Sequence, residues 1–168
     1  MSVPLPIESD RLLIRPFVAE TDSDAMLDVY GDPEVMRFIP GGALRDIGAV
    51  REMLEIHTRV QQTQGFSSWS VVERMTGRVI GDAGFGIFAP TGDIELGYTL
   101  ARDCWGRGYA TEAASACLAA GLTHLAPTRI IAVVDEENTA SLRVAERIGM
   151  ARIETVEVHG RPHSLFAS

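Results

Sequence analysis

The sequence predicts one mixed α/β domain whose sheet is mostly antiparallel, with about seven strands flanked by about four helices. Two observations predict this class. Between residues 66 and 100, three strand-like segments are joined by short polar or glycine-containing connections, which is the pattern of antiparallel hairpins. Further along, a strand, a long helix and a second strand alternate, and such a unit joins two parallel strands by a right-handed crossover. At 168 residues, with no repeat or linker, the chain is expected to be a single domain over residues 1–168.

The first third of the chain predicts one strand and two helices. Residues Arg11–Val18 alternate between apolar and polar side chains, as in a half-buried strand. Apolar residues at helical spacing, among them Met26 and Tyr30, predict a helix from about residue 19 that stops at Gly31. From residue 45 onwards, apolar side chains recur on one face until Gly65, which predicts a long amphipathic helix.

The remaining elements complete the order β-α-α-β-β-β-α-β-α-β-β. Strand-forming runs predict strands over residues 66–73, 77–89, 93–100, 129–134, 151–158 and 162–168. The alanine-rich stretch from about Gly108 to His124 predicts a helix, and so does "NTASLRVAERIG", which begins at Asn138.

Composition limits the classes of function. The net charge of −8 argues against binding of nucleic acid through a basic surface; it weakly favours a cationic partner, although plain solubility explains it better. The two cysteines form no metal-ligand or disulfide pattern, so we expect a reducing compartment and no metal. No signal peptide and no apolar run of about 18 residues is present, which predicts a cytoplasmic protein that does not enter a membrane.

Two glycine clusters are candidates for a phosphate site. "GDAGFG", at residues 81–86, has the spacing GxxGxG instead of the dinucleotide pattern GxGxxG, and no helix follows it. Its glycines are better explained by a bulge or by close packing within a strand. The second cluster, "WGRGYATEA" at residues 105–113, lies between a predicted strand and a predicted helix.

The second cluster can bind an anion for a physical reason. The first turn of a helix has about four N–H groups without partners, and the helix dipole adds positive charge there. Gly106 and Gly108, with the small Ala110, would let a phosphate approach those amides. Arg107 adds a full charge and Thr111 a hydroxyl group. A tight turn that needs glycine only for its backbone remains the alternative.

The segment "ELGYTLARDCWGRGYATEA", residues 95–113, resembles the pyrophosphate loop of GNAT N-acetyltransferases, and specifically their Rim-type branch, which acetylates the N-termini of ribosomal proteins. Trp105 occupies the position where the general GNAT pattern has Gln or Arg, but tryptophan is ordinary in this branch. "SDRLLIRPF" and "DEENTASLRVAERIGM" resemble the opening strand and the second signature of the same branch. The resemblance covers nearly the whole chain.

The resemblance implies a GNAT-like sheet in which the one parallel pair of strands encloses acetyl-CoA as the cosubstrate. The pyrophosphate would lie on the amides from Arg107 to Thr111, and the pantetheine arm would pair with the backbone of residues 98–102. The residues implied to bind the cofactor are Leu100, Arg102, Gly106, Arg107, Gly108, Tyr109, Ala110, Thr111, Asn138 and Ser141.

The same resemblance implies two catalytic residues. Asn138 is a good helix N-cap by itself, and in the family it also binds the pantetheine arm. Ser141 is implied to protonate the leaving thiolate, because Ala145 stands where many GNAT enzymes have a tyrosine for that role. Glu95 is the candidate general base, since family members often use a glutamate on this strand. A solvated strand carboxylate is the alternative interpretation of Glu95.

The acceptor is expected to be a primary amine, either a protein N-terminus or a small molecule. The early helices, from about Ala19 to Gln64, cover the acceptor side in relatives, and His159 and His163 are further candidates for contact with the substrate. A domain that binds or senses acyl-CoA with weak or no catalysis is the alternative function. Both a monomer and a homodimer are compatible with the sequence.

Overall fold

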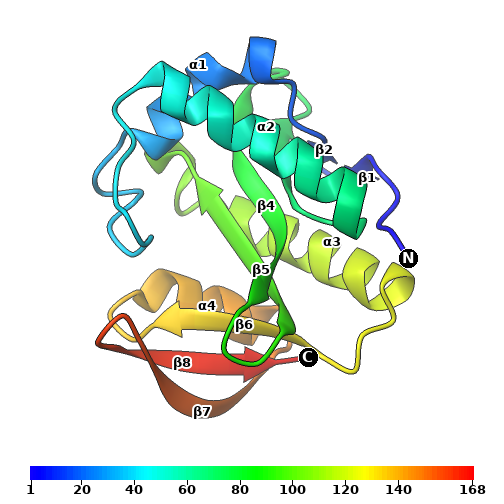
Figure 1. The fold of residues 1–168 in the computed structure, drawn as a ribbon, viewed down its shortest axis with the longest axis vertical. Coiled ribbons are helices and arrows are strands. Elements are labelled where there is room, and N and C mark those ends of the chain that lie inside the picture. Colours follow the sequence, from blue (N-terminus) through cyan, green and yellow to red (C-terminus); the bar gives the residue numbers. More distant parts are fainter.

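A computed structural model describes residues 1–168 as one mixed sheet with helices on both faces (Figure 1). The strands lie in the order β1-β2-β3-β4-β5-β6-β8-β7. Their bounds are β1 Ile7–Glu8, β2 Leu12–Arg15, β3 Ser68–Glu73, β4 Val79–Phe88, β5 Asp93–Leu100, β6 Ile130–Asp135, β7 Ala151–Val158 and β8 Arg161–Ala167. The helices are α1 Ala19–Tyr30, α2 Ile47–Gln64, the short 3-10 helix η1 Arg102–Cys104, α3 Tyr109–His124 and α4 Thr139–Arg147.

The predicted fold class is confirmed. All neighbouring strands pair antiparallel except β5 and β6, which are parallel. The crossover between them carries α3. One strand was not predicted: β1 has only two residues, too few for an alternating pattern, and it pairs with the β2 strand through Ile7 and Ile14. The predicted first strand is also shorter than expected, because it ends at Arg15 before Pro16.

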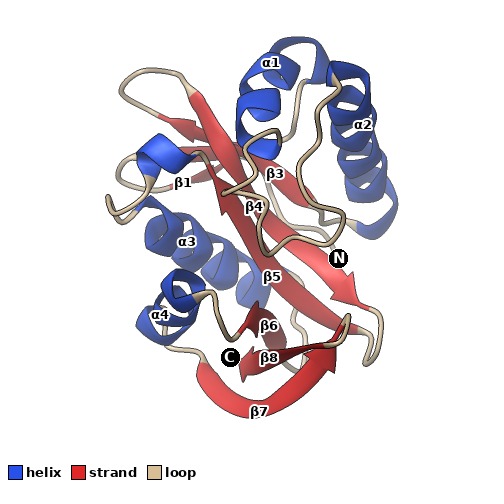
Figure 2. Ribbon diagram, turned by 90° about the vertical axis from the view of Figure 1, so that its left-hand side faces the viewer, coloured by secondary structure: helices blue, strands red, loops and turns tan.

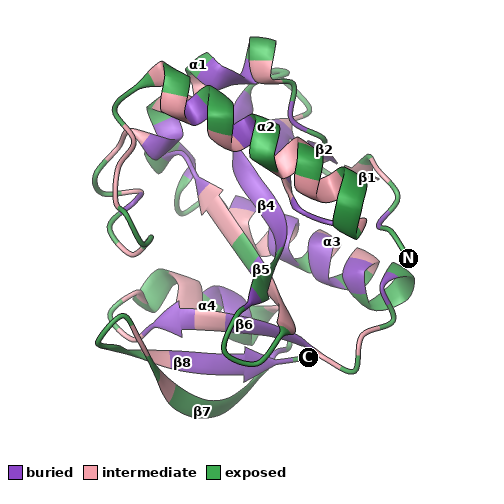
Figure 3. Ribbon diagram, in the orientation of Figure 1, coloured by how far each residue is buried: buried purple, intermediate pink, exposed green.

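Helices α1 and α2 cover one face of the sheet near the N-terminal strands, and α3 and α4 cover the other face (Figure 2). Between the layers lies a core of buried apolar side chains, shown in purple along the central strands and the inner side of α3 in Figure 3. Trp69 is its largest member and packs edge to face on Phe85, with the ring centroids 5.8 Å apart. None of the helices combines the length and the apolar composition needed to cross a bilayer.

The first glycine cluster serves strand packing. A Cβ atom on Gly81 would lie 2.0 Å from the carbonyl oxygen of Thr99, and one on Gly84 would lie 2.1 Å from that of Ser67. These positions need glycine because neighbouring backbone approaches too closely for any side chain. Both glycines lie inside β4, which agrees with the interpretation of this cluster as a strand feature.

Candidate active site

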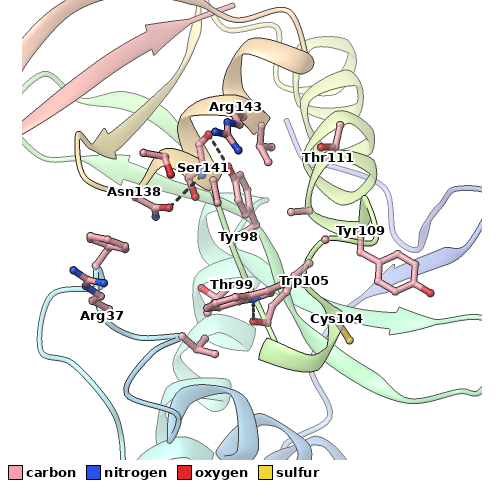
Figure 4. Close-up of a pocket in the computed structure, with 18 of the residues that line it drawn as sticks. Arg37, Tyr98, Thr99, Cys104, Trp105, Tyr109, Thr111, Asn138, Ser141 and Arg143 are labelled. Atoms are coloured by element: carbon pink, nitrogen blue, oxygen red, sulfur yellow. Dashed lines mark hydrogen bonds between the residues drawn. The ribbon is translucent and has the colours of Figure 1, made fainter.

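The parallel strands β5 and β6 pair over a short stretch and then separate. Their register contains only the pairs Ile94–Ile130 and Glu95–Ile131. Beyond these pairs, a cavity of about 600 Å³ lies beside the end of β5 (Figure 4). Its walls come from the end of β5, the turn before α3, the first turns of α3 and α4, and residues 34–39 between α1 and α2.

The free edge of β5 offers backbone groups to this cavity. The N–H of Ala101 donates to the carbonyl oxygen of Ile80 on the β4 side, at 2.8 Å. Peptide groups alternate in direction along a strand, so those of Tyr98 and Leu100 point away from β4, toward the gap. The indole Nε1–H of Trp105 donates to the carbonyl oxygen of Leu100 at 2.9 Å, which satisfies one of these groups.

The start of α3 offers a second set of backbone donors. Between Gly106 and Thr111, no backbone N–H donates a hydrogen bond within the protein. Gly106 and Gly108 have φ angles of +73° and +81°, which only glycine adopts readily. Gly108 is the N-cap of α3 and has no side chain that could occupy those amides. The predicted glycine turn therefore exposes a continuous run of free amides at the positive end of a helix.

Two of the expected cofactor residues point elsewhere. The guanidinium group of Arg107 lies 3.5 Å from Glu73 and over the ring of Tyr109, and Arg107 does not line the cavity. Tyr109 does line it, while its hydroxyl group donates to Glu73. Arg102 is exposed within η1 and lies outside the lining. The other expected residues line the cavity: Leu100, Gly106, Gly108, Ala110, Thr111, Asn138 and Ser141.

Helix α4 brings Asn138 and Ser141 to the opposite wall (Figure 4). The Asn138 side-chain oxygen accepts a hydrogen bond from the Ser141 N–H at 3.2 Å, so Asn138 caps the helix. Its NH₂ group has no partner within the protein. The hydroxyl group of Tyr98 reaches across from β5 and donates to the carbonyl oxygen of Ser141 at 3.4 Å. Ala145 is buried and leaves Tyr98 as the nearest phenol to Ser141.

Glu95 is half-buried on β5 and does not line the cavity. Burial raises the pKa of its carboxyl group to about 7, and the backbone of Val133 opposes this rise. By strand alternation, Glu95 shares a face of β5 with Thr99, which does line the cavity. The carboxyl group of Glu95 is therefore on the same side of β5 as the half-buried Thr99, but outside the cavity lining.

A second buried carboxylate lies beneath Thr99. Asp82 pairs with Thr99 across the β4–β5 ladder and accepts hydrogen bonds from Ser68 at 2.6 Å and from Tyr30 at 3.2 Å. Its other oxygen, Oδ1, is buried without a partner. Burial raises the pKa of Asp82, and the hydrogen bond from Ser68 opposes this rise.

The sequence interpretation missed several cavity residues. Arg143 and Arg147 lie one turn apart on α4, both line the cavity, and neither pairs with a carboxylate. Their four-residue spacing places the two arginines on one face of α4, but nothing in the local sequence shows that this face borders the cavity. Arg37, on the α1–α2 connection, lies 4.0 Å from Glu137 across the cavity mouth. No local pattern predicts that contact.

The two candidate histidines belong to the β7–β8 hairpin. His159 occupies the β7–β8 turn with a φ angle of +50°. His163 lies 4.0 Å from Asp135 and also contacts the carbonyl oxygen of Arg161. Neither residue lines the cavity. No group of three His, Cys, Asp or Glu side chains is arranged to hold a metal ion.

Comparison with known proteins agrees with this geometry. YkkB of Bacillus subtilis is 31% identical over 168 residues, which cover 99% of this chain and 96% of YkkB. The crystal structure of a GNAT-family acetyltransferase from Bacillus anthracis matches with a TM-score of 0.82 at 27% identity, covering 97% of this chain and 96% of that one. The ribosomal L7/L12 alpha-N-protein acetyltransferase RimL, solved in complex with coenzyme A, shares the fold at 15% identity and a TM-score of 0.80, over 98% of this chain and 97% of RimL.

A protein-family model also matches the part of the chain that forms the cavity. Residues 11–151 match the model described as the acetyltransferase (GNAT) domain, and this range includes both the glycine turn before α3 and the start of α4. The chain therefore belongs to the GNAT acetyltransferase family.

Proposed function

We propose that this protein is an N-acetyltransferase that binds acetyl-CoA in the cavity and transfers the acetyl group to a primary amine. The observation that carries the proposal is the run of free amides from Gly106 to Thr111, which faces a cavity between separated strands. Such a helix start accepts a diphosphate without the cost of burying an unpaired charge. The unpaired guanidinium groups of Arg143 and Arg147 favour a ligand with several phosphate charges.

The pantetheine arm has a matching surface. Its amides can pair with the peptide groups of Tyr98 and Leu100 that face the gap, in the manner of an added strand. On the other wall, the free NH₂ group of Asn138 can donate to a carbonyl oxygen of the arm. The diphosphate and the arm would thus be bound mainly by backbone groups that the fold already holds in place.

Acetyl transfer then needs two proton movements. The attacking amine must lose a proton as its nitrogen forms a bond to the thioester carbon, and Glu95, with a pKa of about 7, is suited to accept it. Because Glu95 does not line the cavity, we propose that it acts through a water molecule. When the carbon–sulfur bond breaks, the hydroxyl group of Ser141 passes its proton to the sulfur and takes a proton in return from solvent water, which leaves a neutral serine and a free thiol. The acceptor is a protein N-terminus or a small amine.

A domain that binds acyl-CoA without efficient catalysis is the second candidate. The buried Ala145 favours it, because the phenol that serves as the acid in many family members is missing from that position. A binding measurement cannot separate the two candidates. An assay for the release of free thiol in the presence of an amine acceptor separates them.

Thermal melts with acetyl-CoA, desulfo-CoA, NAD and ATP, run side by side, test the binding site. A ligand at a hundred times its dissociation constant stabilises a protein by about 2.7 kcal/mol, which moves the melt by several degrees. Both CoA ligands should stabilise the wild type but not Gly108→Glu, because a side chain at this positive φ angle strains the turn and its carboxylate adds negative charge beside the proposed phosphate site. Gly77→Glu is the matched control, because Gly77 also has a positive φ but lies in the β3–β4 turn.

The outcomes separate cleanly. If neither CoA ligand shifts the wild-type melt, the glycines serve only the turn, and the proposed function is wrong. If both ligands shift it, a thiol-release assay over a panel of amines, including short peptides with free N-termini, decides between the enzyme and the binding domain.

A further inference from the structure

We propose that Arg11 is a positioning residue that aims the N–H of Gly108 into the cavity. This inference rests on the proposed diphosphate site and names a residue that acts on it from outside. Arg11 does not line the cavity, and it lies 96 residues before Arg107 in the sequence.

Three interactions, two from the side chain and one from the backbone, hold Arg11 against the start of α3. Its Nε donates to the Glu112 carboxylate at 2.7 Å, and the Arg11 backbone N–H donates to the same carboxylate at 2.8 Å. Its guanidinium carbon lies 4.4 Å from the centre of the Tyr109 ring. A further donor of the same group reaches the loop: Nη1 donates to the carbonyl oxygen of Arg107 at 2.9 Å.

That last hydrogen bond sets the direction of a neighbouring amide. A trans peptide unit is planar, so its C=O and N–H groups point in opposite directions. The carbonyl group of Arg107 and the N–H of Gly108 belong to the same unit. When Arg11 holds the carbonyl oxygen on the outer side, the Gly108 N–H must point to the inner side, where Gly108 lines the cavity.

The loop needs this restraint because its own sequence leaves it free. Glycine adopts positive and negative φ almost equally well, and both Gly106 and Gly108 flank the Arg107 residue. A Cβ atom on Gly106 would meet nothing within 4 Å, so packing does not fix the loop there. Rotation of the Arg107–Gly108 unit would turn a carbonyl oxygen toward the phosphates and repel them.

A purely structural role of Arg11 predicts a different effect of its loss on ligand binding. If Arg11 only ties β2 to α3 through Glu112, its loss lowers the melting temperature and affects every ligand alike. If it orients Gly108, its loss weakens only ligands that carry the diphosphate. Pantetheine has the arm without phosphate and separates the two cases.

The test is calorimetric titration of coenzyme A, and NMR titration of pantetheine, with Arg11→Met. The loss of one oriented donor should raise the dissociation constant for coenzyme A by about tenfold or more and leave that for pantetheine within about twofold. Coenzyme A should shift the amide signal of Gly108 in the wild type and should shift it much less in the variant. Arg11→Lys keeps the charge but not the planar fork, and we expect it to behave like Arg11→Met.

Arg74→Met is the matched control. Arg74 has a similar exposure, and it bonds the same N-terminal segment at the carbonyl oxygen of Ser9, but it does not reach the loop. Equal coenzyme A affinity in Arg11→Met and the wild type would overturn the inference, and so would an equal loss for pantetheine. If Arg11→Met does not fold, Arg11→Lys provides the same comparison. Failure of the wild type to bind coenzyme A would instead overturn the proposed function.

Discussion

The indole of Trp105 donates a hydrogen bond to the carbonyl oxygen of Leu100, at 2.9 Å. This bond joins the glycine turn before α3 to the last residue of β5, where the strand borders the cavity. The tryptophan that departs from the general family pattern thus links the proposed diphosphate site to the edge proposed for the pantetheine arm. Its ring is half exposed, at 50%, and forms part of the cavity wall.

Trp105 should therefore report ligand binding by fluorescence. The chain has two tryptophans, and the other, Trp69, is buried in the core. Coenzyme A should change the emission of the wild type and of Trp69→Phe, but not that of Trp105→Phe. The latter variant should also lose about 1 kcal/mol of stability, because the Leu100 carbonyl group loses its donor. A ligand-induced change that persists in Trp105→Phe would contradict this assignment.

Asn138→Asp separates the two proposed roles of Asn138. Aspartate caps a helix about as well as asparagine, so the free energy of unfolding should change little. The carboxylate cannot donate a hydrogen bond, so the affinity for coenzyme A should fall by about tenfold. The reciprocal exchange Asp46→Asn, at the N-cap of α2, is the control and should change neither quantity. If Asn138→Asp binds coenzyme A as tightly as the wild type does, Asn138 only caps helix α4 and does not bind the pantetheine arm.

Ser141→Ala tests the proposed acid. If the hydroxyl group protonates the thiolate, kcat should fall by about a hundredfold while the affinity for acetyl-CoA stays within a few fold. Tyr98→Phe is the necessary comparison, because the Tyr98 hydroxyl group lies 3.4 Å from the carbonyl oxygen of Ser141. A loss of kcat confined to Tyr98→Phe would transfer the role to the phenol.

How far the sequence predicts this molecule depends on the range of each interaction. The order of elements was predictable because hydrophobic periodicity and glycine turns are local signals. Only β1 was missed, because two residues are too few to show a periodic pattern. The glycine turn before α3 was predictable for the same reason, while its use as an anion site stays a prediction. The early separation of β5 from β6 was not, because strand register depends on packing between distant segments.

Side-chain direction was the harder problem within the site. Arg107 was expected beside the anion, but Glu73 and Tyr109 attract its guanidinium group to the outer side of the loop. Arg11 carries no local signal at all, because its partners begin 96 residues further along the chain. A charged residue next to a motif in the sequence is therefore expected to lie near the site, but its position in the sequence does not show whether its side chain faces the ligand.

Glu95 should control the pH dependence of both activity and stability. Because the pKa of Glu95 is about 7, kcat/KM should rise between pH 6 and pH 8 with a midpoint at about 7. Glu95→Gln should lower the rate by about a hundredfold or more and abolish this midpoint. The exposed strand carboxylate of Glu157 is the control, and Glu157→Gln should retain the wild-type profile.

The stability effect of Glu95 has the opposite sign. A carboxyl group whose pKa is raised from 4.5 to about 7 binds its proton more tightly in the folded state. The free energy of unfolding should therefore fall as the pH rises from about 4.5 to about 7, by up to about 3 kcal/mol. Chemical denaturation at pH 5 and pH 8 measures this fall, which should be smaller in Glu95→Gln. An identical fall of the free energy of unfolding in Glu95→Gln would mean that another group causes it. For the activity, a pH profile of the wild type without a midpoint near 7 would exclude Glu95 as the base.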